Sequence, residues 1–196
     1  MMKLRLFTAL LPKPELLKGI ISLQKACRRS GMKNLRFIEA ENLHITVNFL
    51  GDTGPEDLST LHEILTGGVS SLKAPAFRAE ALGLFPSPRR ARSLNLLLED
   101  PEGSMEAMFR HLDGLLRAAG FPGEDRRFRP HICFGRFRTR RGEVVEADAL
   151  PAVPSGMRGI VRGSELLLLR SELGPGGARY YSEGRYPFGT EKTMGD

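Results

Sequence analysis

The stretch Leu43-His44-Ile45-Thr46-Val47-Asn48-Phe49-Leu50-Gly51 decides how we expect this chain to fold. Polar and apolar residues alternate along it, which predicts a β-strand with one face in the core. The polar face would carry His44, Thr46 and Asn48. The core face would carry Leu43, Ile45, Val47 and Phe49. A shorter version of the pattern recurs at His131-Ile132-Cys133-Phe134, so the first stretch predicts one half of a paired site.

Hydrophobic periodicity predicts that helices and further strands surround these two strands. Apolar residues recur at helical spacing in three segments, 14–31, 55–66 and 101–120. Further strands are expected at 3–11, 77–84, 93–98, 165–170 and 179–188. Each histidine strand follows a helix, a glycine and a basic segment, which amounts to a weak internal repeat. This order predicts an α+β fold with antiparallel sheets, whose two halves face each other across a cleft.

The composition is that of a globular protein with an excess of positive charge. Hydrophobic residues make up 41% of the 196 residues, enough for one domain or for two small lobes packed as one unit. Lys and Arg outnumber Asp and Glu by 29 to 23, which gives a net charge of +6. That excess suits an anionic partner such as a nucleic acid or a phosphorylated small molecule, although many basic proteins bind neither.

The number of cysteines and the length of the apolar runs indicate the compartment in which we expect the protein to act. The sequence has two cysteines, Cys27 and Cys133, too few for a disulfide framework, so we expect a reducing, cytoplasmic setting. The N-terminal apolar run ends at Pro12 and is shorter than a good signal-peptide segment. No other stretch approaches the roughly 20 apolar residues of a membrane span, so no membrane partner is predicted.

Two imidazoles that face one cleft would make an acid–base pair, because near neutral pH one can accept a proton while the other donates one. Thr46 and Cys133 each follow a histidine by two residues, where they suit a phosphate oxygen. Taken singly, either histidine could equally be structural, and the repeat is what favours catalysis. A metal site is disfavoured because neither histidine has a Cys, Asp or Glu at zinc-ligand spacing. Cys133 lacks the Asn or Asp motif that activates a cysteine nucleophile.

Five segments spread over nearly the whole chain carry a resemblance to a known family. They are residues 5–12, 41–51, 85–90, 127–136 and 170–180. They resemble the RNA 2′,3′-cyclic phosphodiesterases, also called 2′-5′ RNA ligases, of the two-histidine phosphoesterase superfamily. The resemblance implies a bilobal fold of two antiparallel sheets, related by a pseudo-two-fold axis, with helices on the outside. It also implies that residues 1–196 form a single bilobal phosphodiesterase domain.

The implied reaction is hydrolysis of a 2′,3′-cyclic phosphate at an RNA end to a 2′-phosphate, with no metal and no cofactor. Ligation of 2′-5′ RNA ends would be its reverse. His44 would protonate the leaving 3′-oxygen, and His131 would activate the attacking water. The implied phosphate-binding residues are Thr46, Cys133 and Arg136.

Four positions depart from simple expectation. Strict alternation puts Arg136 on the face opposite His131, so its role requires a β-bulge at Gly135 or a side chain that curls round the strand edge. Cys133 stands where the family has threonine, and a thiol is the weaker hydrogen-bond donor, which predicts slower turnover. Phe37 and Asn95 stand where the family has tryptophans, which predicts weaker base stacking or a different substrate.

We therefore expect a monomeric enzyme that acts on RNA ends or nucleotides with a 2′,3′-cyclic phosphate. Its arginine-rich segments, 89–92 and 126–129, would contact the nucleic-acid backbone. Two other functions stay open. One is a phosphodiesterase for a small cyclic nucleotide, and the other is a non-catalytic RNA-binding module in which Cys133 marks a site that has lost its chemistry.

Overall fold

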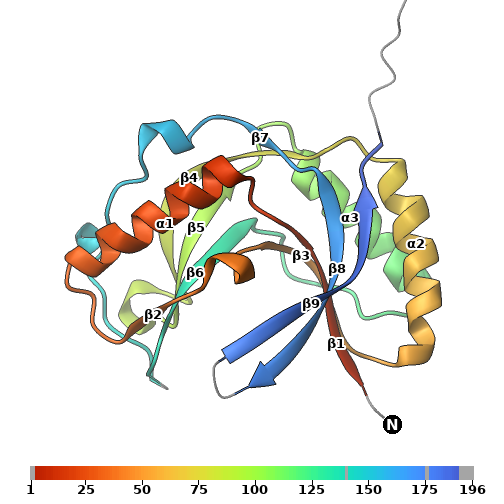
Figure 1. Ribbon diagram of the computed structural model, residues 1–196, viewed down its shortest axis with the longest axis horizontal. Coiled ribbons are helices and arrows are strands. Elements are labelled where there is room, and N and C mark those ends of the chain that lie inside the picture. The colour runs from red at the N-terminus through yellow and green to blue at the C-terminus, as the bar shows by residue number, and fades with distance from the viewer. Residues whose placement is uncertain (1–2, 140, 175–176, 190–196) are drawn as a thin grey trace, which may run out of the picture.

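Nine strands and three α-helices make up the part of the chain that the computed structural model describes, residues 3–139, 141–174 and 177–189 (Figure 1). The strands are β1 (Leu4–Leu10), β2 (Leu35–Phe37), β3 (Ile45–Thr53), β4 (Ala76–Phe85), β5 (Ser93–Glu99), β6 (His131–Phe137), β7 (Val161–Arg162), β8 (Glu165–Gly174) and β9 (Gly177–Pro187). The helices are α1 (Pro14–Arg29), α2 (Leu58–Ser70) and α3 (Ser104–Ala118). All of the strand pairs are antiparallel, which confirms the predicted α+β fold.

The strands fall into two groups that meet at the two histidine strands. One group runs β7-β4-β5-β6, with β2 also paired to β6, and the other runs β3-β1-β8-β9. The two groups join where Ile45 of β3 pairs with Ile132 of β6. In Figure 1, α1 lies beside the first group, whereas α2 and α3 lie beside the second. This is the arrangement of two antiparallel sheets with outer helices that the resemblance implies.

The helices bury the apolar stripes that the sequence predicts. In α1, which has Pro14 in its first turn, the buried apolar residues are Leu16, Ile20, Leu23 and Cys27. Burial raises the pKa of the Cys27 thiol to about 11, so this cysteine stays protonated and packs as a core residue. Gln24 of α1 donates to the carbonyls of Ile38 (2.8 Å) and Phe134 (3.3 Å), which anchors the helix to β6.

A β-bulge in β3 changes which side chains reach the face of His44. The partners of Thr46 and Phe49 are only two residues apart on β1, so β3 holds one extra residue between these positions. Asn48 is therefore buried, and its backbone N–H donates to the Thr8 hydroxyl at 3.0 Å. Phe49 is 56% exposed. The predictions that Asn48 shares the face of His44 and that Phe49 enters the core are wrong, because both assume unbroken alternation.

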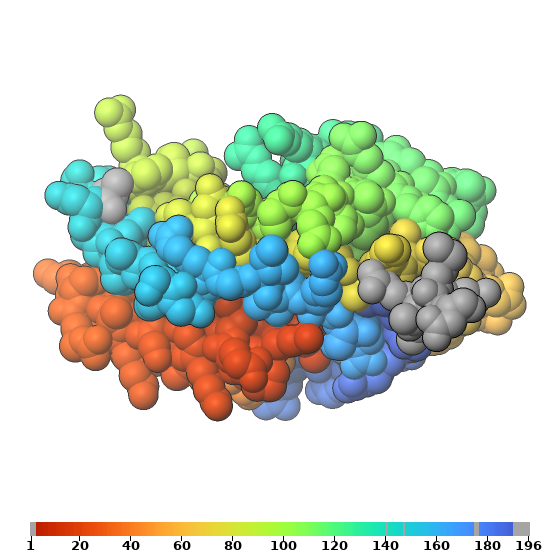
Figure 2. Space-filling view, turned by 90° about the horizontal axis from the view of Figure 1, so that it is seen from above, coloured from red at the N-terminus to blue at the C-terminus, as the bar shows by residue number. Residues whose placement is uncertain are grey.

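The connection from β6 to β8 crosses the outside of the molecule. In Figure 2, residues 150–165 form a cyan to blue band. It lies between α1, in orange and red, and the yellow and green segments, about residues 70–125. Met157 lies in a short 3₁₀ helix, Ser155–Met157, and packs against α1 at Gly19. A Cβ added at Gly19 would lie 2.6 Å from the Met157 sulfur, so only glycine fits there without a shift. This band covers the core on the side away from the two histidines.

A buried hydrogen bond fastens α2 to β9. The Tyr186 hydroxyl lies 2.6 Å from His62 Nδ1, and burial raises the pKa of that hydroxyl to about 12. We expect Tyr186→Phe to lower the free energy of unfolding by about 1 kcal/mol, because a buried hydrogen bond is lost while the ring stays. Urea unfolding measures this. Tyr181→Phe, at an exposed position of the same strand, is the control, and an equal loss in both variants would contradict the assignment.

Candidate active site

The two histidine motifs pair with each other about a local two-fold centre. Ile45 and Ile132 are the paired residues, and both are fully buried in the main core. Extending this antiparallel register by one residue places His44 across from Cys133 and Thr46 across from His131. Side chains alternate between the faces of a strand, so these four side chains share the face opposite the core. Each imidazole therefore lies beside the third residue of the other motif.

Both imidazoles are oriented by the same kind of hydrogen bond. His44 Nδ1 lies 2.8 Å from the carbonyl oxygen of Asn42, and His131 Nδ1 lies 2.8 Å from that of Arg129. A carbonyl oxygen only accepts, so in each ring Nδ1 carries the hydrogen and donates it. Nε2 is then the atom left for proton transfer in both rings. The backbone two residues upstream thus sets the tautomer of each histidine.

His44 is electrostatically coupled to the rest of the site. Burial lowers the pKa of its imidazole, and the positive charges of Arg136 and His131 lower it further. The hydrogen bond to the Asn42 carbonyl acts in the opposite direction and favours the protonated ring. The charge effects require His131 and Arg136 to lie near His44, although these residues are about 90 positions away in the sequence.

A second β-bulge, in β6, brings Arg136 to the face of the histidines. The β5 partners of Cys133 and Gly135 are adjacent residues, so Phe134 is an extra residue in β6. Beyond it, Arg136 pairs with Ser93 on the same face as His131. This is the bulge on which a phosphate-binding role for Arg136 depends.

Thr46 and Cys133 differ in whether their side chains already make a hydrogen bond. Thr46 is half-buried, and its hydroxyl makes no side-chain hydrogen bond within the described residues. The Cys133 thiol donates to the Gly135 carbonyl at 3.6 Å, toward the bulge of its own strand. Burial raises the pKa of this thiol, and the nearby Arg136 only partly opposes that effect. Cys133 is therefore a neutral, weak donor rather than a thiolate.

Aromatic rings that the sequence did not assign to the site enclose both histidines. Phe7 of β1 lies 5.1 Å from the His44 ring, and Tyr180 of β9 meets that ring edge-on at 4.9 Å. Phe85, at the end of β4, meets His131 edge-on at 5.1 Å. These residues lie in segments that resemble the family, but no local spacing links them to a histidine. The rings limit how far each imidazole can turn.

A second arginine on this face was also missed. Arg36 of β2 pairs directly with Arg136, and such cross-strand partners share a face. Its guanidinium lies 3.5 Å from where a Cβ on Gly177 would be, at the start of β9. Arg36 therefore adds a second guanidinium to the strand face that carries Arg136. The signal in the sequence was the basic segment before the first histidine motif.

Neither a cluster of metal ligands nor a membrane-spanning helix occurs in the described residues. Within residues 3–139, 141–174 and 177–189, no three His, Cys, Asp or Glu side chains converge as metal ligands would. None of the helices in these ranges combines the length and apolar character needed to cross a bilayer.

Comparison with known proteins places this geometry in a family. Residues 10–94 match the family model described as LigT like Phosphoesterase. The RNA 2′,3′-cyclic phosphodiesterase of Methanothermobacter thermautotrophicus is 31% identical, over 91% of this chain and 96% of that protein. The protein of the same name from Archaeoglobus fulgidus is also 31% identical, over 77% of this chain and 82% of that protein.

Solved structures share the fold. The crystal structure of TT0787 of Thermus thermophilus superposes with a TM-score of 0.78 at 25% identity, over 95% of this chain and 99% of that one. E. coli LigT complexed with 3′-AMP superposes with a TM-score of 0.71 at 23% identity, over 96% and 99% of the two chains. The chain therefore belongs to the LigT-like phosphoesterase family of RNA 2′,3′-cyclic phosphodiesterases, which confirms both the resemblance and the class of enzyme predicted from the sequence.

Proposed function

We propose that this protein hydrolyses the 2′,3′-cyclic phosphate at RNA ends to a 2′-phosphate, with His44 and His131 as its acid–base pair and without a metal ion. The observation that carries the proposal is the matched pair of imidazoles, each donating Nδ1–H to a backbone carbonyl at 2.8 Å. The names of the relatives add support for the substrate, since both are RNA 2′,3′-cyclic phosphodiesterases.

In this proposal each group has one task. Nε2 of His131 takes a proton from water, and the resulting nucleophile attacks phosphorus in line with the bond to the 3′-oxygen. That bond breaks, and Nε2–H of His44 protonates the departing oxygen. The products are a 2′-phosphate and a free 3′-hydroxyl, and proton exchange with solvent restores both imidazoles. A bound phosphate anion favours the protonated form of His44, against the effect of burial.

The phosphate oxygens would be held by Thr46, Cys133 and Arg136. Charged donors aimed at developing negative charge stabilise the transition state, and Arg136 is the charged member of this set. With the 5′-hydroxyl of a second RNA in place of water, the same groups would form a 2′-5′ linkage, which is ligation. We further propose that residues 1–196 act as a single bilobal unit, as a monomer in the cytoplasm.

Hydrolysis of a short RNA ending in a 2′,3′-cyclic phosphate, in the presence of EDTA, tests the proposal. The expected result is a product that carries only a 2′-phosphate, with a rate that EDTA does not change. Loss of activity in EDTA, or a 3′-phosphate product, would overturn the mechanism. Parallel assays with a cyclic mononucleotide show whether a small cyclic nucleotide is the better substrate.

Cys133→Thr should raise kcat/KM by up to about tenfold, because a hydroxyl is a stronger donor to a phosphate oxygen than a thiol. Thr46 holds the equivalent position in the first motif, so the substitution makes the two motifs alike. Steady-state kinetics on the cyclic-phosphate RNA measure the effect. Cys133→Ala is the control and should be slower than wild type. Tight RNA binding without turnover in all three proteins would support the RNA-binding module instead.

A further inference from the structure

A cavity of about 780 Å³ adjoins the site on the side of His131. It lies where β5 ends and where the segment between α3 and β6 approaches the sheet. Its principal walls are Phe85, Leu97, Glu106, Arg127, Phe128 and Arg129. The volume falls within the usual range for pockets that bind small molecules and cofactors, so it is large enough for a nucleotide.

Three contacts make this cavity continuous with the surroundings of His131. Leu97 pairs with His131 across β5 and β6, so the two side chains are neighbours on one face. The Phe85 ring meets the imidazole edge-on at 5.1 Å. The carbonyl that accepts from His131 Nδ1 belongs to Arg129, a wall residue. A ligand with its phosphate at His131 would therefore extend directly into the cavity.

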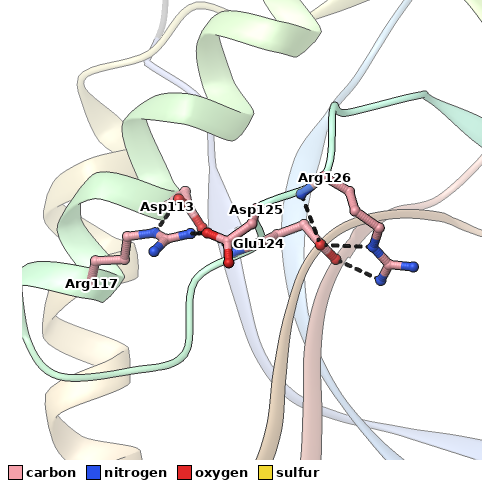
Figure 3. A network of polar contacts seen from close by, with 5 residues as sticks. All are labelled: Asp113, Arg117, Glu124, Asp125 and Arg126. Atoms are coloured by element: carbon pink, nitrogen blue, oxygen red, sulfur yellow. Dashed lines mark hydrogen bonds and ion pairs between the residues drawn. The ribbon is translucent and has the colours of Figure 1, made fainter.

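The arginines of the segment that leads into β6 are not equivalent. Arg126 is ion-paired with Glu124 at 2.9 Å, and Arg117 of α3 is paired with Asp113 and Asp125, as Figure 3 shows. Of these pairs, Arg117 with Asp125 holds the segment against α3. Within the arginine-rich segment 126–129, Arg126 is therefore the member whose guanidinium already pairs with a carboxylate.

Arg127 and Arg129 differ from Arg126 in their surroundings. Both are exposed, both line the cavity, and neither has a carboxylate partner in the described part of the chain. Phe128 between them stacks on Phe109 of α3 at 4.8 Å, which fixes the segment in place. Two unneutralised arginines on a fixed segment are suited to bind anions.

Two of the three acidic residues of the cavity, Glu106 and Asp100, have partners of their own. Glu106 is paired with Arg110 at 2.8 Å. The Asp100 carboxylate accepts backbone N–H groups from Met105 (3.2 Å) and Glu106 (2.9 Å) at the start of α3. Glu80 is the remaining wall carboxylate, and it can accept a hydrogen bond from a ribose hydroxyl or a base amino group.

We propose that this cavity is a subsite for the terminal nucleoside, whose ribose carries the cyclic phosphate, and for the phosphodiester on its 5′ side. The proposal rests on the RNA-end phosphodiesterase activity proposed above. Arg127 and Arg129 bind the phosphodiester that links the terminal nucleotide to the one before it, and the apolar surface of Phe85 and Leu97 takes the terminal base. The enzyme then prefers an RNA end to a cyclic mononucleotide, because a mononucleotide lacks the phosphodiester that the two arginines bind.

The test compares kcat/KM for a trinucleotide and for a mononucleotide, each ending in a 2′,3′-cyclic phosphate. We expect wild type to favour the trinucleotide by at least about tenfold, the scale of one charged hydrogen bond. In the double variant Arg127→Gln, Arg129→Gln, that ratio should fall toward one. The salt dependence of log kcat/KM for the trinucleotide should also become shallower, by about 0.7 for each phosphate that an arginine no longer neutralises.

The matched control is Lys25→Gln, Arg29→Gln, which removes two charges from the exposed side of α1 and should keep the wild-type ratio. A double arginine variant that also keeps the wild-type ratio would overturn the subsite while leaving the proposed activity intact. If wild type hydrolysed neither substrate, the proposed activity would fail instead. Binding of a trinucleotide 2′-phosphate to wild type and variant would then still test the cavity, and equal affinities would refute it.

Discussion

Replacing either His44 or His131 with alanine is expected to lower kcat for cyclic-phosphate RNA by about a hundredfold to ten-thousandfold. In the proposed mechanism, each variant removes one proton-transfer group and leaves the other in place. The double variant should be little slower than the worse single variant, because an acid and a base that act in one step do not contribute independently. Single-turnover kinetics, with the enzyme in excess over the RNA, measure the chemical step directly.

His111→Ala is the matched control, since His111 lies exposed on α3. It should keep the wild-type rate, and thermal unfolding should show that all of the variants fold. Binding of RNA separates loss of chemistry from loss of affinity. Full activity in both His44→Ala and His131→Ala would refute the acid–base pair.

Arg136→Gln should lower kcat/KM by about a hundredfold or more, the effect of removing a donor that stabilises developing charge. It should also move one limb of the pH profile. The pKa of His44 is lowered first by burial and then by the charge of Arg136, so the substitution raises that pKa toward its ordinary value. The profile of kcat/KM reports this change, because it follows the ionisation of the free enzyme.

Which limb of the profile moves identifies the role of His44. A general acid must start protonated, so the rate falls as pH rises through its pKa, and a raised pKa moves the alkaline limb to higher pH. A general base must start neutral, and the acid limb would move to higher pH instead. The control is Arg138→Gln, an exposed arginine two residues further on. An alkaline limb that stays in place in Arg136→Gln would contradict the assignment of His44 as the acid.

Local patterns in the sequence were sufficient to predict most of the fold. Helical spacing in α1 and alternation around His44 depend on residues close in sequence, and the structure confirms both. The same alternation predicted that His44 and Thr46 share a face. It failed from Asn48 onward, because an extra residue in one strand shows only against its partner strand, β1.

The surroundings of the site depend on contacts that sequence spacing does not encode. Tyr180 reaches His44 from the last strand, and Phe85 reaches His131 across β5. Arg136 needed a bulge that only the pairing with β5 reveals. Each of these placements follows from how strands far apart in the sequence align. That alignment cannot be read from a single amino-acid sequence.

The pairing of Ile45 with Ile132 has a consequence for how such an enzyme could arise. Each imidazole has beside it the hydroxyl or thiol of the other motif, so the surroundings of each histidine are built from both halves. A half-length protein with one such motif would hold neither complete surroundings for its histidine nor both imidazoles of the proposed acid–base pair. Two identical copies of such a half, related by a true two-fold axis, would supply both. Fusion of the two copies into one chain would then allow each motif to change independently of the other. The difference between Thr46 and Cys133 illustrates such a change.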